Sequence, residues 1–273
     1  MRHEIVHNYN VVRRLEALGA VFVEHEDEIP EGEICVLSAH GVAPAVREAC
    51  EKKGLRVVDA VCPLVSKVHA EARRYADSGH LVALIGHANH VEVIGTKGER
   101  PEQIVVVESP EDAEKLDTNG QPLAVITQTT LSLDDVASTV DVLGERFGDL
   151  RRPGAEDICY ATQNRQDAVK EIVQRGATLL LVIGSPTSSN ANRLVEVAQA
   201  RGAEATLIDG ESPLDRELLK GHRIVGLTAG ASTPEALVQA VLGSLAESGY
   251  DEVEDVTVAR EDVHFRLPRE VYA

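Results

Sequence analysis

Short runs of apolar residues alternate along the chain with longer stretches in which apolar and polar positions follow a helical period. A short apolar run is typical of a buried strand, and an amphipathic stretch is typical of a helix that covers it. The alternation therefore predicts βα units around parallel sheets. The expected strands are residues 34–38, 56–60, 81–86, 104–107, 123–127, 178–184, 205–209 and 223–228.

Helix starts are marked by small polar residues that can cap the free backbone N–H groups of a first turn. Ser109, Ser212 and Thr233 each stand directly before a proline, which favours the first helical turn. Ser132 stands before Leu133 and two acidic residues, which suit the positive end of a helix dipole. The sequence predicts that helices begin at these positions.

The βα units group into three comparable blocks, and no low-complexity linker separates them. We expect a first lobe formed by residues 1–61 together with 246–273, a second lobe at 62–153 and a third lobe at 154–245. The predicted fold class is therefore α/β, with three small lobes that have mainly parallel sheets around a central site. The first lobe is expected to be incomplete, because the chain opens in what reads as the middle of a strand.

The composition is that of a folded protein with an aliphatic core, since 43% of the residues are hydrophobic and only 3% are aromatic. Acidic residues outnumber basic ones 45 to 27, and the net charge of -18 argues against a nucleic-acid partner, because such binding depends on Lys and Arg. No apolar run is long enough to cross a bilayer, and no signal-peptide core follows Met1. The sequence predicts a cytoplasmic protein without a membrane partner.

Polar and thiol side chains follow the predicted strands at their carboxyl ends, the edge at which open α/β sheets bind ligands. Taken singly, each has an ordinary explanation. Ser, Thr and Asn cap helices, a histidine is often only hydrogen-bonded, and Cys35 and Cys50 read as small buried hydrophobes. Capping does not explain why His40, His90, Glu92 and two loop cysteines all fall on this edge, so a shared site is the better hypothesis.

The hydroxyl and amide residues of these loops suit an anionic substrate. Neutral donors at helix N-termini are the arrangement that binds phosphate or diphosphate, and they are expected from Ser188, Ser189, Asn190 and Ser232.

The remaining loop residues suit proton and metal chemistry. The histidines His7, His40 and His90 can carry charge near neutral pH, and Glu92 is a candidate proton donor if its pocket raises its pKa. Cys62 and Cys159 open two successive blocks, which suits a central metal cluster better than a disulfide. Two thiolates alone do not hold a cubane cluster.

Several loop strings are specific enough to indicate a family. They resemble, in order along the chain, the signature segments of the 4-hydroxy-3-methylbut-2-enyl diphosphate reductases: SAHGV at 38–42, DAVCPLV at 59–65, GHANHVEV at 86–93, TQTTLS at 127–132, DICYAT at 157–162, GSPTSSNAN at 184–192 and TAGAS at 228–232.

The resemblance implies a trefoil of three α/β lobes around a [4Fe–4S] cluster that three cysteines hold, two of them Cys62 and Cys159. It implies that Glu92 and Thr129 relay protons to an allylic diphosphate, which is bound by His7, His40, His90, Thr129, Ser188, Ser189, Asn190 and Ser232. The implied reaction is the reductive dehydroxylation of 4-hydroxy-3-methylbut-2-enyl diphosphate to isopentenyl and dimethylallyl diphosphate in the non-mevalonate isoprenoid pathway. A ferredoxin or flavodoxin is the implied electron donor.

The sequence departs from the family pattern at two places. Val91 stands where the family usually has proline, which removes no reacting group. Before the position of Met1 the family has a strand, a Gly-Phe-Cys-type loop with the first cluster cysteine, and a helix. We therefore expect this chain to be N-terminally truncated and inactive as it stands. A start codon assigned too far downstream is favoured over a deliberate fragment or replacement of the ligand by Cys35 or Cys50.

Two other function classes compete with the reductase. A non-catalytic diphosphate-binding remnant would keep the Ser, Asn and His loops but hold no stable cluster, and its iron content would distinguish it. A metallohydrolase built on His90 and Glu92 is disfavoured, because two ligands are too few for a metal site.

Overall fold

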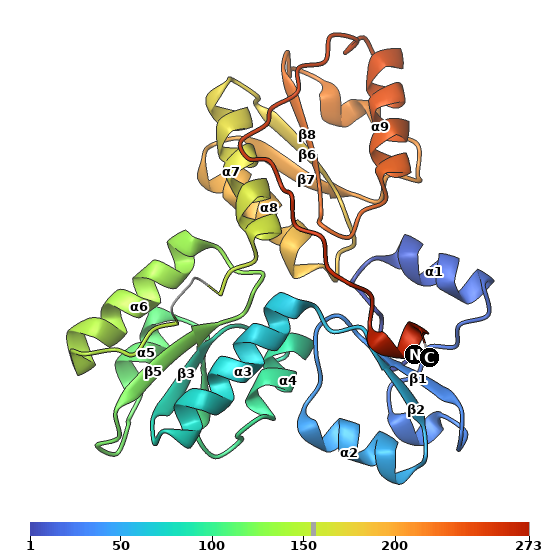
Figure 1. Cartoon of the computed structure of the whole chain (residues 1–273). Coiled ribbons are helices and arrows are strands. Elements are labelled where there is room, and N and C mark those ends of the chain that lie inside the picture. The colour runs from blue at the N-terminus through green and yellow to red at the C-terminus, as the bar shows by residue number, and fades with distance from the viewer. Residues whose placement is uncertain (154–156, 273) are drawn as a thin grey trace. The chain divides into compact units, whose positions relative to one another are not determined.

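The computed structural model describes residues 1–153 and 157–272. Every predicted strand is present and pairs in parallel with its neighbours (Figure 1). In the described part of the chain they form three sheets, with the orders β1-β2, β4-β3-β5 and β7-β6-β8. The strands are β1 (Ile34–Leu37), β2 (Arg56–Asp59), β3 (Leu81–Ile85), β4 (Ile104–Val107), β5 (Leu123–Thr127), β6 (Leu179–Ile183), β7 (Glu204–Ile208) and β8 (Val225–Ala229). The predicted α/β class with small, parallel sheets is confirmed.

Helices follow most of the strands. They are α1 (Tyr9–Ala17), α2 (Pro44–Lys52), α3 (Pro63–Asp77), α4 (Val91–Lys97), α5 (Pro110–Lys115), α6 (Leu133–Phe147), α7 (Tyr160–Gln174), α8 (Ser189–Ala200) and α9 (Glu235–Glu247), with the short 3-10 turns η1 (Glu26–Glu28), η2 (Arg216–Leu219) and η3 (Arg269–Tyr272). Among the described residues, none of these helices has the length and apolar character that a bilayer span requires.

The chain divides into two compact units. The first unit comprises Met1–Val6, Gly19–Cys159 and His264–Ala273, and the second comprises His7–Leu18 and Tyr160–Val263. The expected division into three lobes stays a prediction. Its boundary at residue 154 lies outside the described residues.

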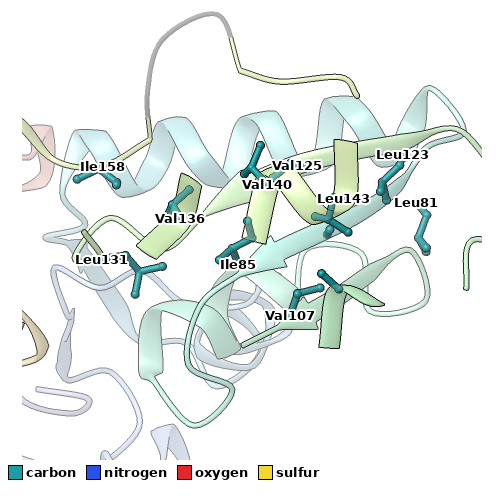
Figure 2. Packing of buried hydrophobic residues seen from close by; sticks show 12 residues of the cluster. Leu81, Ile85, Val107, Leu123, Val125, Leu131, Val136, Val140, Leu143 and Ile158 are labelled. Atoms are coloured by element: carbon teal, nitrogen blue, oxygen red, sulfur yellow. The ribbon is translucent and has the colours of Figure 1, made fainter. Parts of the chain in front are cut away.

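The three-stranded sheet of the first unit is covered on both faces. All residues of the central strand β3 are buried. Ile85 and Leu143 belong to the cluster that packs one face against α5 and α6 (Figure 2), and Leu84 and Val68 belong to the cluster that packs the other face against α3 and α4. Two covered faces explain why these strands read as continuous apolar runs. The packed layers hold the strand ends from which the site loops emerge.

The β1-β2 pair has a separate small core that includes Cys35, Leu37 and Cys50. The first residues of the chain run beside β1, where the Arg2 N–H donates to the Val36 carbonyl at 3.0 Å. The opening residues, which the sequence predicts to be part of a strand, are connected to β1 only by isolated bridges and form no strand. The turn η3 packs against β2 and so returns the C-terminal segment to the first unit.

The second unit repeats the three-layer plan. Leu180 and Val182 of the central strand β6 pack with α7 and α8, while Leu181 and Ile183 pack with α9. Alternate residues of one strand thus serve opposite faces. The carboxyl ends of β6 and β8 lead into the loops before α8 and α9.

Three of the four predicted helix starts are confirmed, at α5, α6 and α9, and the one at Ser212 is wrong. The hydroxyls of Ser109 and Ser132 cap α5 and α6. Ser212 instead donates to Asp209 at 2.7 Å and closes a turn. Thr233 donates to the carbonyl of Ile183 at 2.9 Å, so α9 begins without a side-chain cap. In both cases a nearby acceptor competes for the hydroxyl that the sequence pattern assigns to capping.

Candidate active site

The carboxyl group of Glu92 is buried and is held by one residue of the neighbouring strand end. Glu92 lies in the first turn of α4, which follows β3, and Thr129 lies just beyond β5, which pairs with β3. The Thr129 N–H donates to Glu92 Oε1 at 2.7 Å, and the Thr129 hydroxyl donates to Oε2 at 2.9 Å. Glu92 is 2% exposed. The structure thus brings into contact two residues that the sequence assigned to one edge.

The environment of Glu92 brings the pKa of its carboxyl group close to neutral pH. Burial raises the pKa of Glu92 to about 7, the two hydrogen bonds from Thr129 oppose that rise, and the negative charge of Asp157 adds to it. A carboxyl group with a pKa near 7 has both the protonated and the ionised form at neutral pH. Such a carboxyl group can donate a proton at neutral pH and then be protonated again.

Two histidine rings lie near the start of α4, the helix that carries Glu92. His90 caps α4, and its Nδ1 accepts the backbone N–H of Glu92 at 3.2 Å. An accepting Nδ1 places the proton of the neutral ring on Nε2. The ring of His40, in the loop after β1, lies edge-on to that of His90 with 5.9 Å between centroids. The structure therefore groups His40, His90 and Glu92, as the sequence suggested.

Neither of the two loop cysteines is in a disulfide, and both are half-buried. Cys62 directly precedes α3, and its N–H donates to the carbonyl of Ala39, the neighbour of His40, at 3.0 Å. Cys159 directly precedes α7, and its N–H donates to the carbonyl of Thr129 at 3.0 Å. Backbone hydrogen bonds thus tie each cysteine to a loop that carries another site residue.

The donor chemistry of these thiols fits an iron–sulfur cluster, for which cysteine thiolates are the usual ligands. Within residues 1–153 and 157–272, no three His, Cys, Asp or Glu side chains gather as a metal site.

The sequence reasoning missed a buried charge cluster beside Cys159. Asp157 accepts a hydrogen bond from Lys67 Nζ at 3.1 Å, and Lys67 lies 3.9 Å from Glu71. Burial and the neighbouring Asp157 raise the pKa of Glu71 to about 7. The DICYAT string placed Asp157 near a cysteine, but its partner Lys67 is 90 positions away and no local pattern connects them.

Gln128 was also missed. It is 1% exposed, its Oε1 accepts the N–H of His87 at 3.0 Å, and its Nε2 donates to Thr130 at 2.7 Å. The bond from His87 joins the loop after β3 to the loop after β5, and the bond to Thr130 lies within the latter loop. The available signal was a long polar side chain directly before Thr129 at the end of an apolar strand.

In the second unit, the expected diphosphate-binding residues lie at the start of α8 and in the loop after β8. The Ser188 hydroxyl caps α8 by accepting the Ala191 N–H at 3.3 Å. Asn190 is 7% exposed, and neither its Oδ1 nor its Nδ2 has a hydrogen-bond partner. A Cβ atom at Gly230 would lie 3.7 Å from Asn190 Nδ2, so the loop after β8 passes close to this amide. A buried polar group without a partner costs about 1–3 kcal/mol, which a ligand that bonds it would recover.

The other expected binding residues of the second unit lie at helix starts or in the same loop. Ser189 is the first residue of α8, and Ser232 lies two positions beyond Gly230 and is half-buried. His7 directly precedes Asn8, whose side chain caps α1 by accepting two backbone N–H groups. The ligand-binding roles of these residues stay predictions.

Comparison with known proteins gives one family. The LytB protein family matches residues 1–246. A 4-hydroxy-3-methylbut-2-enyl diphosphate reductase of Acidothermus cellulolyticus is 53% identical over 99% of this chain and 80% of its own length. A reductase of the same name from Mycobacterium ulcerans is 51% identical over 99% of this chain and 82% of its own length.

The fold agrees with a solved structure. The structure of the E-1-hydroxy-2-methyl-but-2-enyl-4-diphosphate reductase from Plasmodium falciparum matches with a TM-score of 0.95 and 38% identity, over 99% of this chain and 86% of that one. Fold and relatives together define an α/β oxidoreductase of isoprenoid biosynthesis. Within that class, the chain belongs to the LytB family. The resemblance that the loop strings indicate is confirmed.

Proposed function

We propose that the protein reduces 4-hydroxy-3-methylbut-2-enyl diphosphate to isopentenyl and dimethylallyl diphosphate. Two electrons and two protons enter, the allylic C–O bond breaks, one proton leaves with the hydroxyl oxygen as water, and the other is added to carbon. The relatives named for this reduction support the assignment. The observation that carries it is the buried carboxyl group of Glu92, with a pKa near 7, held by Thr129.

Glu92 is the proposed proton donor. Burial keeps its carboxyl group partly protonated at neutral pH, and the Thr129 hydroxyl, which can both donate and accept, extends the path of the proton. The His90 ring caps the helix start that carries Glu92, the His40 ring lies against that of His90, and both rings are proposed to contact the anionic substrate. These residues orient the hydroxyl-bearing end of the substrate and protonate its leaving oxygen.

The proposed cofactor is a [4Fe–4S] cluster, with Cys62 and Cys159 as two of its thiolate ligands. When bound, a cluster of this kind supplies the electrons. A ferredoxin or flavodoxin is the proposed source of those electrons. The four cysteines of the described residues form no disulfide, which fits a reducing compartment, and we propose the cytoplasm.

The diphosphate is assigned to the second unit. Ser188, Ser189 and Asn190 stand at the start of α8, where backbone dipoles favour an anion. The partnerless amide of Asn190 is suited to donate to a phosphate oxygen. Ser232 and His7 are proposed as further donors to the same substrate.

A second candidate function is the binding of an allylic diphosphate without reduction. It is favoured by one observation, the absence of a group of three metal-ligating side chains among the described residues. The test is anaerobic reconstitution with iron and sulfide, followed by iron analysis and a turnover assay with a chemical reductant. Bound iron with formation of the two products supports the reductase, whereas tight substrate binding without iron or product supports the binding protein.

A further inference from the structure

The buried side chain of Asp157, two residues before Cys159, is bonded both to the end of β5 and to α3, the helix that follows Cys62. Its Oδ2 accepts the backbone N–H of Thr127 at 3.1 Å, and its Oδ1 accepts a hydrogen bond from Lys67 Nζ at 3.1 Å. The side chain is 0% exposed. A carboxylate in that position is tolerated only with such partners, because removal of a charge from water is costly.

The segment from Asp157 to Cys159 is bound to the end of β5 at both of its ends. At one end Asp157 accepts from Thr127, and at the other the Cys159 N–H donates to the Thr129 carbonyl at 3.0 Å. The two bonds align residues 157–159 with residues 127–129. Cys159 is therefore set against Thr129, the residue that holds Glu92.

Lys67 connects this segment to the other cysteine. It lies in α3, five positions after Cys62, the residue that directly precedes the helix. A helix is stiff over so short a distance, so a bond from Lys67 to Asp157 relates the start of α3 to the segment that ends at Cys159. Glu71 lies 3.9 Å from Lys67 on the same helix and shares the ammonium charge.

We propose that Lys67 and Asp157 are positioning residues that hold Cys159 in register with β5 and with the Cys62 end of α3, so that the two thiols are presented to a metal cluster. The role in metal binding rests on the proposed function. The alignment of Cys159 with the end of β5 does not depend on that function. The Asp157 side chain is fully buried, whereas that of Lys67 is 31% exposed, so removal of Lys67 leaves a buried carboxylate without its cation, which is destabilising. Because Asp157 lies two residues before Cys159, we expect the loss of the ion pair to change the position of the Cys159 thiol.

The test uses the whole chain with Lys67→Met, Asp157→Asn and the charge-preserving Lys67→Arg. Lys170→Met is the matched control, because Lys170 also pairs with an aspartate, Asp167, at 3.5 Å, but on α7 in the second unit. Hydrogen exchange is followed at the amides around Thr127 and Cys159. Iron retained during a chelator challenge is measured on the reconstituted proteins.

We expect exchange at the Cys159 amide to rise about ten- to a hundredfold in Lys67→Met and Asp157→Asn, as loss of a hydrogen bond to a charged group implies. Iron should be lost faster in the same two variants. Lys67→Arg and Lys170→Met should behave like the unaltered chain. This pattern supports the proposal.

Unchanged exchange in Asp157→Asn overturns the register, and faster exchange with unchanged iron retention overturns the positioning of the thiols. If the unaltered chain retains no iron, the proposed function fails separately. Hydrogen exchange then still tests the register. Faster exchange at the Cys159 amide in Asp157→Asn supports it, and unchanged exchange overturns it.

Discussion

Glu92 and Thr129 are joined by two hydrogen bonds, one from the threonine N–H at 2.7 Å and one from its hydroxyl at 2.9 Å. The first is a permanent donor to the carboxyl group, and the second can reverse its direction when the carboxyl group is protonated. The pair therefore tolerates both states of Glu92 without losing its geometry. This is what a group that gives up and regains a proton requires.

Replacement of Glu92 by glutamine should separate substrate binding from chemistry. Glu92→Gln keeps the size and the acceptor for the Thr129 N–H but cannot donate an acidic proton. We expect turnover of the reconstituted protein to fall by about 10² to 10⁴, the usual contribution of a positioned acid. Substrate affinity and iron content should remain near those of the unaltered protein. Near-normal turnover in this variant would exclude Glu92 as the proton donor.

Stability should depend on pH through the same residue. A carboxyl group with a higher pKa in the folded protein than in the unfolded chain binds more protons when folded between the two values. The pKa of Glu92 rises from 4.5 to about 7, so its contribution to the free energy of unfolding is fully present below 4.5 and is lost as the pH rises through 7. The shift corresponds to about 3 kcal/mol.

Urea unfolding should therefore show a larger loss of stability between about pH 5 and about pH 8 in the unaltered chain than in Glu92→Gln. Glu71, whose pKa is also raised to about 7, contributes in both proteins, so the difference isolates Glu92. Equal slopes in the two proteins would mean that Glu92 is ionised throughout this range.

The amide of Asn190 should matter for ligand binding and not for folding. Asn190→Ala removes a buried amide that has no hydrogen-bond partner, so we expect unchanged or higher thermal stability. Affinity for the diphosphate substrate should fall about ten- to a hundredfold, as loss of one donor to a charged group implies. Gln199→Ala, at the far end of α8, is the matched control for calorimetric titration. Equal affinity in the two variants would place the diphosphate elsewhere.

The four cysteines should divide into two reactive and two inert thiols. Cys35 and Cys50 are 0% exposed with 3.9 Å between their sulfur atoms, and burial together with Cys35 raises the pKa of Cys50 to about 12. Because the thiolate is the reactive form, a maleimide should modify Cys62 and Cys159 first. Mass spectrometry after iron reconstitution should show protection of these two. Equal labelling of Cys50 would contradict this assignment.

The central strands β3 and β6 were predictable because each is buried on both faces. β3 and β6 consist of consecutive apolar residues, and this pattern depends on the sequence alone. The starts of α5 and α6 were predictable for a similar reason, since a cap acts within one turn. The hydrogen bond that Thr233 makes in place of a helix cap was not predictable, because its acceptor Ile183 is 50 positions away.

The candidate site was predictable in its residue types and not in its contacts. Strand ends placed Glu92 and Thr129 on one edge, but only the fold specifies their two hydrogen bonds. The hydrogen bond from Lys67 to Asp157 could not be predicted either, because it too is specified only by the fold. In the sequence, each residue alone resembles an ordinary surface charge.

The most direct test of the proposed reaction is the mass of the product formed in heavy water. Iron-reconstituted protein that also carries the Gly-Phe-Cys-type loop of the family, a chemical reductant and 4-hydroxy-3-methylbut-2-enyl diphosphate are incubated anaerobically, and the diphosphates are analysed by mass spectrometry. Reductive dehydroxylation predicts isopentenyl and dimethylallyl diphosphate that have lost the hydroxyl oxygen and gained one deuterium on carbon. Substrate that is bound by the iron-loaded protein but recovered unchanged, or a product that keeps its hydroxyl group, would contradict the account.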